Sequence, residues 1–203
     1  MKLYGGSRSP FFRKVRVVLE EKGIPYQIER LTPVPKTPEL LAMHPMGKIP
    51  ILRDGDLVIP DSSVICAYLE RVHPAPALYP QDPGEFAAAL FLEEYADTRM
   101  SEIIGGIAFE TFVKPQILRE SGDPARAADL RARLPEIFDY LESRVPEDRE
   151  WILPRFGIAD VAVGVMLQGV GLIGEQIDTA RWPRVARYRR SVEARPSFKT
   201  AIS

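Results

Sequence analysis

The chain has 203 residues, of which 45% are hydrophobic and 27% are charged, and its formal net charge is −1. These values exclude a disordered chain and a strongly basic nucleic-acid-binding surface, and they allow one or two globular domains. No apolar run approaches the ~20 residues of a membrane helix. Charges are spread through the first residues instead of a secretory signal, so we expect a cytoplasmic protein with no membrane partner.

Cysteine and histidine are too few for metal or disulfide chemistry. The single cysteine, Cys66, cannot form an internal disulfide, and His44 and His73 without a cysteine cluster do not make a conventional zinc site. Cys66 lies in an apolar pattern with helical spacing, which is typical of a buried structural thiol. We therefore predict a protein without a bound metal.

The first part of the chain alternates strand and helix patterns. In chain order we expect a strand at 1–4, a helix at 10–22, a strand at 26–31, a loop at 32–38, a short helix at 39–43, strands at 49–53 and 57–59, and a helix at 61–72. Asp54-Gly55 between the last two strands is a hairpin signal. This order predicts one mixed sheet with helices packed on it.

The second part contains only helical patterns. Prolines crowd the residues after His73 and predict a linker. Helices are expected at 85–120, with interruptions at Gly105-Gly106 and Pro115, and at 125–145, 158–174 and 183–194. The sequence therefore predicts an α/β domain at 1–76, a linker at 77–84 and an all-helical domain at 85–203.

Ser9 stands at the start of the first predicted helix, directly before Pro10. A hydroxyl at a helix N-terminus lies beside unpaired N–H groups and the positive end of the helix dipole, where an anion such as a thiolate is favoured. A simple N-cap is the alternative role, and Ser7 is a rival hydroxyl. The helix is basic, which indicates either a solvated face or attraction of an anionic ligand; its basic residues are Arg8, Arg13, Lys14 and Arg16.

Four motifs in order resemble the cytosolic glutathione transferase family over the whole chain. They are Ser9-Pro10-Phe11, the stretch HPMGKIPIL at 44–52 (similar to N-P-x-G-K-V-P), PDSSVI at 60–65 (similar to E-S-x-A-I), and Trp151-Ile152 with GIAD at 157–160 and RPSF at 195–198. The resemblance is to a serine-type, theta- or zeta-like bacterial member. It implies a thioredoxin-like domain followed by an all-helical domain, and a homodimer.

The resemblance also implies a glutathione site in the first domain, with glutathione as co-substrate. Ser9 would be the catalytic hydroxyl, and Ile49 would precede a cis Pro50 and pair its backbone with the cysteinyl part of the ligand. Lys48 would meet the glycyl carboxylate. Asp61, Ser62 and the N–H groups that follow would hold the γ-glutamyl end.

The implied activity is conjugation of the glutathione thiolate to a small hydrophobic electrophile. Candidate pocket residues, for most of which core packing is the alternative, are Phe11, Met100, Ile103, Ile104, Phe109 and Phe112. A non-catalytic binding or regulatory protein and a glutathione-dependent peroxidase or isomerase are alternative functions. A thiol reductase is disfavoured, because no cysteine stands near the first helix start.

Two positions depart from the family pattern. Gly157 replaces the usual Ser or Thr at a helix start, which costs only a few tenths of a kcal/mol, and Asp160 is expected to reach back to the Gly157 N–H. Asp61 replaces Glu and shortens that side chain by one methylene.

Overall fold

The computed structural model describes residues 1–203, which form two compact units. Met1–Tyr79 together with Arg195–Ser203 make the first unit, and Pro80–Ala194 make the second. The all-helical domain expected at 85–203 differs from this division at its end, because the last residues belong to the first unit. No helix is long and apolar enough to cross a membrane, and no three metal-ligating side chains cluster.

The first unit contains every strand of the protein. Its elements are β1 Lys2–Gly5, α1 Pro10–Glu21, β2 Gln27–Arg30, α2 Pro38–Met43, β3 Ile51–Asp54, β4 Leu57–Pro60, α3 Ser62–Val72 and α10 Pro196–Ile202. The seven elements predicted up to residue 72 are confirmed to within two residues at each end. The helix α10 was not predicted.

The four strands form one mixed sheet in the order β2-β1-β3-β4. β1 is parallel to β2 and antiparallel to β3, with Tyr4 opposite Ile51, and β3 is antiparallel to β4, with Ile51 opposite Pro60. The end of β1, the start of β3 and the end of β4 therefore meet at one edge of the sheet.

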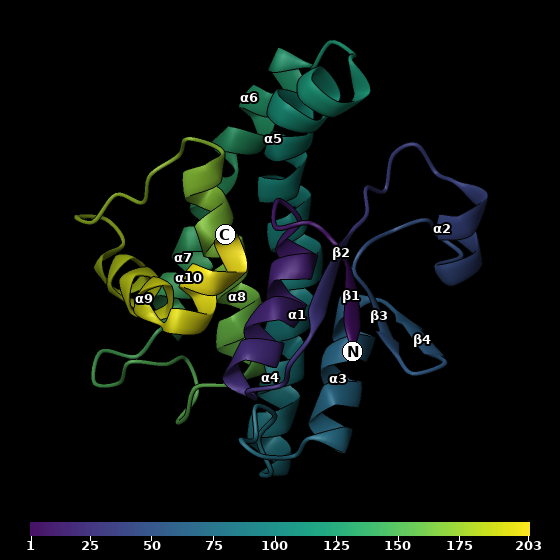
Figure 1. Ribbon diagram of the computed structural model, residues 1–203. Coiled ribbons are helices and arrows are strands. Elements are labelled where there is room, and N and C mark those ends of the chain that lie inside the picture. The colour runs from purple at the N-terminus through teal and green to yellow at the C-terminus, as the bar shows by residue number, and fades with distance from the viewer. The chain divides into compact units, whose positions relative to one another are not determined.

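Helix α1 begins and ends where the local sequence predicts. Ser9 is its N-cap, Pro10 follows in the first turn, and Gly23 at φ +62° ends it in the left-handed conformation that favours glycine. The helix packs against α3 and α10, whereas α2 lies apart from α1 and α3 (Figure 1). Its apolar stripe is fully buried and includes Phe12, Val15 and Leu19.

Three of the four basic residues lie inside α1 and are buried, so the interpretation as a solvated face is wrong for them, whereas Arg8 precedes the helix and is exposed. Arg13 is 1% exposed, Lys14 0% and Arg16 7%. Lys14 Nζ donates to Ser63 Oγ at 2.8 Å, and Arg16 donates to the Ser203 carbonyl oxygen at 2.8 Å. Segments distant in the sequence cover this helix on several sides, which the local pattern does not reveal.

The second unit is helical throughout. Its elements are α4 Pro83–Tyr95, the π-helix η1 Ala96–Gly105, α5 Gly106–Ala108, the π-helix η2 Phe109–Leu118, α6 Pro124–Ala132, α7 Leu134–Arg144, α8 Ile158–Leu172 and α9 Pro183–Ala194. The expected interruption at Gly105-Gly106 coincides with the junction of η1 and α5, but it is not a break in the helix, because both glycines keep right-handed helical angles. Pro115 likewise lies inside η2.

The single helix expected at 125–145 is two helices that meet at Arg133. Pro135 stands in the first turn of α7. Proline has no N–H for the helix interior but fits a first turn, so its position explains the division.

Helix α8 forms the core of this unit and packs against α4, η1 and α9. Asp160 in its first turn is fully buried and accepts the Gly157 N–H at 3.0 Å, as predicted, and also the Ile152 N–H at 3.1 Å. The buried Tyr188 hydroxyl donates to the same carboxylate at 2.9 Å. Burial, with Asp160 beside it, raises the pKa of Tyr188 well above its ordinary value.

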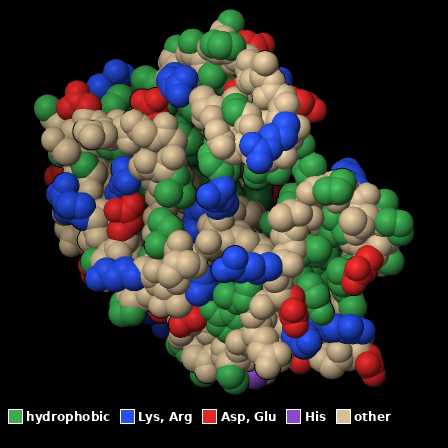
Figure 2. Space-filling model, turned by 45° about the horizontal axis from the view of Figure 1, so that its top comes forward, with side chains coloured by type: hydrophobic (Ala, Val, Ile, Leu, Met, Phe, Trp, Pro, Cys, Tyr) green, Lys and Arg blue, Asp and Glu red, His purple; other side chains and the backbone are tan.

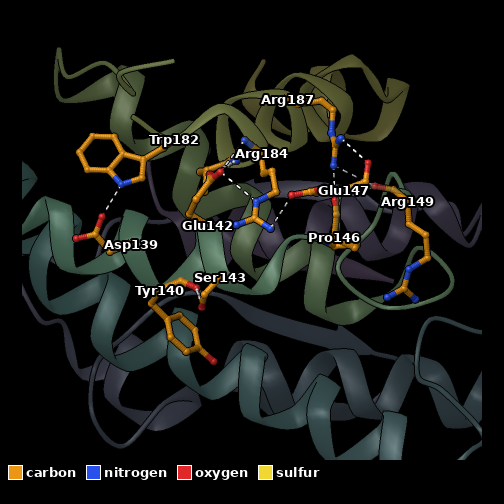
Figure 3. A network of polar contacts seen from close by, with 11 residues as sticks. Asp139, Tyr140, Glu142, Ser143, Pro146, Glu147, Arg149, Trp182, Arg184 and Arg187 are labelled. Carbon is orange, nitrogen blue, oxygen red and sulfur yellow. Dashed lines mark hydrogen bonds and ion pairs between the residues drawn. The ribbon is translucent and has the colours of Figure 1, made fainter. Parts of the chain in front are cut away.

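A polar network joins α7, α9 and the loop after α7 (Figure 3). Trp182 Nε1 donates to Asp139 at 2.7 Å, and Arg184 pairs with Glu142 at 3.1 Å. Arg187 donates to the carbonyl oxygens of Pro146 and Glu147. On the face drawn in Figure 2, basic and acidic side chains are interspersed, in keeping with the net charge of −1.

Candidate functional site

The candidate residues of the first unit gather at the sheet edge where three strands meet. Ser9 follows β1, Ile49 precedes β3, and Asp61 with Ser62 follows β4. The bond from Lys14 Nζ to Ser63 Oγ joins the second turn of α1 to the first turn of α3. Segments separated by more than fifty residues in the sequence therefore meet in one place.

Ser9 combines a capping role with an available donor. Its Oγ accepts the Phe12 N–H at 3.3 Å, and its own N–H donates to the Gly6 carbonyl oxygen at 3.0 Å. The cap uses only a lone pair of the oxygen, and the structure contains no acceptor bonded to the hydroxyl hydrogen. The half-buried hydroxyl can therefore donate to an anion at the helix N-terminus.

The loop before β3 presents unpaired backbone. The Ile49-Pro50 peptide bond is cis, as the resemblance implied. The Ile49 N–H and C=O make no hydrogen bond within the chain, which leaves one donor and one acceptor for an extended ligand. Lys48 is exposed beside them.

Lys36 reaches this loop as well, and the sequence motifs do not single it out. Gly47 has φ +62°, and a Cβ there would lie 2.9 Å from Lys36 Cδ. The alkyl chain of Lys36 thus packs directly over Gly47. Only the tertiary fold brings a second lysine to the loop that carries Lys48.

His44 stabilises the same loop from the inside. It is 2% exposed, and its Nδ1 accepts the Met46 N–H at 3.3 Å. Burial lowers the pKa of His44, Asp61 opposes this shift, and Lys48 adds to it. The neutral imidazole is therefore the form that fits the structure.

Asp61 caps α3 with its own side chain. It has φ +77°, and its Oδ1 accepts the N–H groups of Ser63 at 2.9 Å and Val64 at 3.2 Å. These two amides, which were expected to hold a ligand carboxylate, are thus already occupied. The Ser62 hydroxyl, which makes no hydrogen bond, and Asp61 Oδ2 are polar groups that the cap leaves available at this helix start.

The candidate pocket residues fall into two groups. Met100 and Ile103 are fully buried and Ile104 is 3% exposed, and a Cβ at Gly169 of α8 would lie 3.1 Å from the Ile104 side chain. These three side chains pack in the core of the second unit. Phe109 is 40% exposed, and Phe11 and Phe112 are partly exposed. Their role toward an electrophile stays a prediction.

A thioredoxin-like unit with a mixed four-stranded sheet, together with a helical unit, defines the class of protein. Two family models agree with that class: "Glutathione S-transferase, N-terminal domain" matches residues 3–77, and "Glutathione S-transferase, C-terminal domain" matches residues 124–191. Together they cover more than half of the chain. The chain belongs to the glutathione S-transferase family.

Several relatives match along nearly the whole chain. Glutathione S-transferase U4 of Arabidopsis thaliana is 28% identical over an alignment of 202 residues that covers 95% of this chain and 84% of that protein. A stringent starvation protein A homolog of Haemophilus ducreyi is 25% identical and covers 100% of this chain and 89% of its own. The crystal structure of a glutathione S-transferase from Rhodospirillum rubrum F11 has 27% identity and a TM-score of 0.91, covering 100% of this chain and 91% of that one.

Proposed function

We propose that the protein is a serine-type glutathione transferase, related to the theta and zeta classes. It binds glutathione at the sheet edge and conjugates its sulfur to a small hydrophobic electrophile. The observation that carries this proposal is the Ser9 hydroxyl, which lies at a helix N-terminus with its hydrogen not bonded to any acceptor.

The chemistry follows from what such a hydroxyl does to a thiol. A thiol with an ordinary pKa of about 8.5 is mostly protonated at neutral pH. A hydrogen bond to the thiolate stabilises it by roughly 1.5–3 kcal/mol, which lowers its pKa by about one to two units. The thiolate then attacks an electrophilic carbon, the new S–C bond forms as the leaving group departs, and no covalent enzyme intermediate is needed.

The surrounding groups suit the rest of the tripeptide. The Ile49 N–H and C=O would pair with its cysteinyl backbone, and Lys48 with Lys36 beside it would meet the glycyl carboxylate. The Ser62 hydroxyl would donate to the γ-glutamyl carboxylate. Asp61 uses only Oδ1 for its cap, so Oδ2 would be the acceptor for the γ-glutamyl ammonium.

Ser9→Ala tests this function. We expect kcat to fall by roughly 10- to 100-fold, because one charged hydrogen bond is lost, while the dissociation constant for glutathione changes little. The measurements are aryl-halide conjugation kinetics and calorimetric titration with glutathione. Ser7→Ala is the matched control: Ser7 lies in the same turn and should keep wild-type kcat. An unchanged rate in Ser9→Ala, or a loss confined to Ser7→Ala, would remove Ser9 from the chemistry.

A glutathione-binding protein without turnover is the second candidate. The whole-length match to a protein that is not named as a transferase supports it. Glutathione binding without turnover across a panel of electrophiles and peroxides would favour this candidate.

A further inference from the structure

Arg13 places a buried cation next to the turn that carries Ser9. Its side chain is 1% exposed, and its Nη1 donates to the carbonyl oxygens of Ser7 at 2.9 Å and Arg8 at 3.3 Å. Arg13 stands one helical turn after Ser9, and its own N–H donates to the Ser9 carbonyl oxygen at 3.0 Å. The guanidinium thus folds back toward the start of α1.

These bonds determine how Ser9 is presented. The Ser9 N–H is held by the Gly6 carbonyl oxygen, and the two carbonyls between them are held by Arg13. The turn from Gly6 to Ser9 is therefore fixed both at its ends and in its middle. The direction of the Ser9 hydroxyl depends on a side chain that lies outside the turn.

The location is electrostatically costly for a cation. A positive charge is unfavourable near the positive end of a helix dipole and loses hydration when it is buried. Burial lowers the pKa of Arg13 to about 10, so the guanidinium is still charged at neutral pH.

We propose that Arg13 is a positioning residue for Ser9, and that its buried charge favours the anionic form of a sulfur bound at the hydroxyl. This inference rests on the proposed function and extends it. Ser9 supplies the contact to the sulfur, and Arg13 supplies both the orientation of Ser9 and positive potential from behind the turn.

Two substitutions separate these contributions. Arg13→Lys keeps the charge but lacks the fork that reaches two carbonyls. Arg13→Gln removes the charge and keeps one hydrogen-bond donor group. We expect Arg13→Gln to raise the pKa of the bound thiol by about one unit, which is a tenfold loss of thiolate at a pH below that pKa. We expect Arg13→Lys to lower kcat and to raise the pKa of the bound thiol by less than Arg13→Gln does.

The experiment is a pH titration of glutathione bound to the full-length protein, followed by the ultraviolet absorbance of the thiolate. Calorimetric affinity, kcat and thermal stability are measured in the same buffers. Arg16→Gln is the matched control, because it also removes a buried cation of α1, one that binds Tyr26 and Ser203. It should lower thermal stability without changing the pKa of the bound thiol.

A raised bound-thiol pKa in Arg13→Gln but not in Arg16→Gln supports the inference. A wild-type pKa in folded Arg13→Gln overturns it while leaving the function intact, provided that Ser9→Ala raises that pKa. If Arg13→Gln does not fold, Arg13→Lys decides, and wild-type kcat in that variant overturns the positioning role. If the wild-type protein binds no glutathione, the proposed function fails and the inference fails with it.

Discussion

His44 shows how one buried side chain links the candidate site to pH. It is 2% exposed, and only its neutral form can accept the Met46 N–H through Nδ1. Its pKa in the folded protein is lowered from the ordinary 6.5, mainly by burial. Below that value the unfolded chain therefore binds a proton that the folded protein does not yet bind.

The free energy of unfolding should consequently fall as pH drops below 6.5, until His44 also protonates in the folded state. The binding of one extra proton by the unfolded chain changes the free energy of unfolding by at most about 1.4 kcal/mol per pH unit. Urea unfolding at a series of pH values measures this slope.

His44→Asn is the control variant. Asparagine does not titrate, and its side chain can accept the N–H two residues further on, as the imidazole does here. The free energy of unfolding of wild type minus that of the variant should therefore decrease as pH falls from 7 to 5. Parallel curves over that range would exclude His44 as the titrating group.

At this scale the sequence predicts what is local. Ser9 as an N-cap follows from its neighbour Pro10 and the apolar spacing behind it, and the structure confirms it. The burial of Arg13 and Lys14 was missed, because a charge on a helix looks the same in sequence whether water or another segment covers it. The positive φ of Asp61 was missed too, since only the geometry of the β4–α3 turn demands it.

The element that most changes the division of the chain is α10, which packs on α1 in the first unit. Arg195 Nε donates to Glu21 Oε1 at 2.9 Å and Nη2 donates to Oε2 at 2.7 Å, a bidentate pair. Burial raises the pKa of Glu21, but hydrogen bonds from Arg195 and Ser197 outweigh it, so the pKa is lowered overall. The charged carboxylate thus joins the end of α1 to the start of α10.

Glu21→Gln should lower the free energy of unfolding by about 1–3 kcal/mol, because a partly buried guanidinium loses its charged partner. Urea unfolding at neutral pH measures the change. Glu29→Gln serves as control: the Lys2–Glu29 pair has the same 2.9 Å contact, but its side chains are 48% and 43% exposed. That loss should stay below about 1 kcal/mol. Equal losses of free energy of unfolding in the two variants would show that the Glu21–Arg195 pair stabilises the protein no more than the exposed Lys2–Glu29 pair does.

The boundaries of helices and strands were predictable where the local sequence allows a proline or glycine only one structural role, such as beginning or ending a helix. Pro10 begins α1 and Gly23 ends it. Gly105-Gly106 misled the prediction, because glycine lowers helix propensity without preventing a helix that is held by packing. The helix α10 could not be assigned to the first unit, because the sequence around it does not show that it packs against α1.

On the scale of the whole molecule we expect a homodimer from the family resemblance, and exposed apolar side chains in each unit are candidates for its interface. Phe86, Leu90 and Phe91 of α4 are 39%, 41% and 56% exposed. Met46 and Val64 of the first unit are 53% and 54% exposed. Single exposed apolar residues are ordinary, but three within two turns of one helix indicate an interface.

We expect the wild-type protein to sediment as a homodimer at micromolar concentration and Phe91→Glu to sediment as a monomer. A two-fold interface contains the substitution twice, and each lost apolar side chain is worth roughly 1.5–3 kcal/mol, so association should weaken by at least about 100-fold. Leu172→Glu is the matched control, because Leu172 is an equally exposed apolar side chain, 57% exposed, on another helix, at the end of α8. That variant should remain dimeric. A wild-type monomer would contradict the dimer itself, whereas a dimeric Phe91→Glu would place the interface elsewhere than on this face of α4.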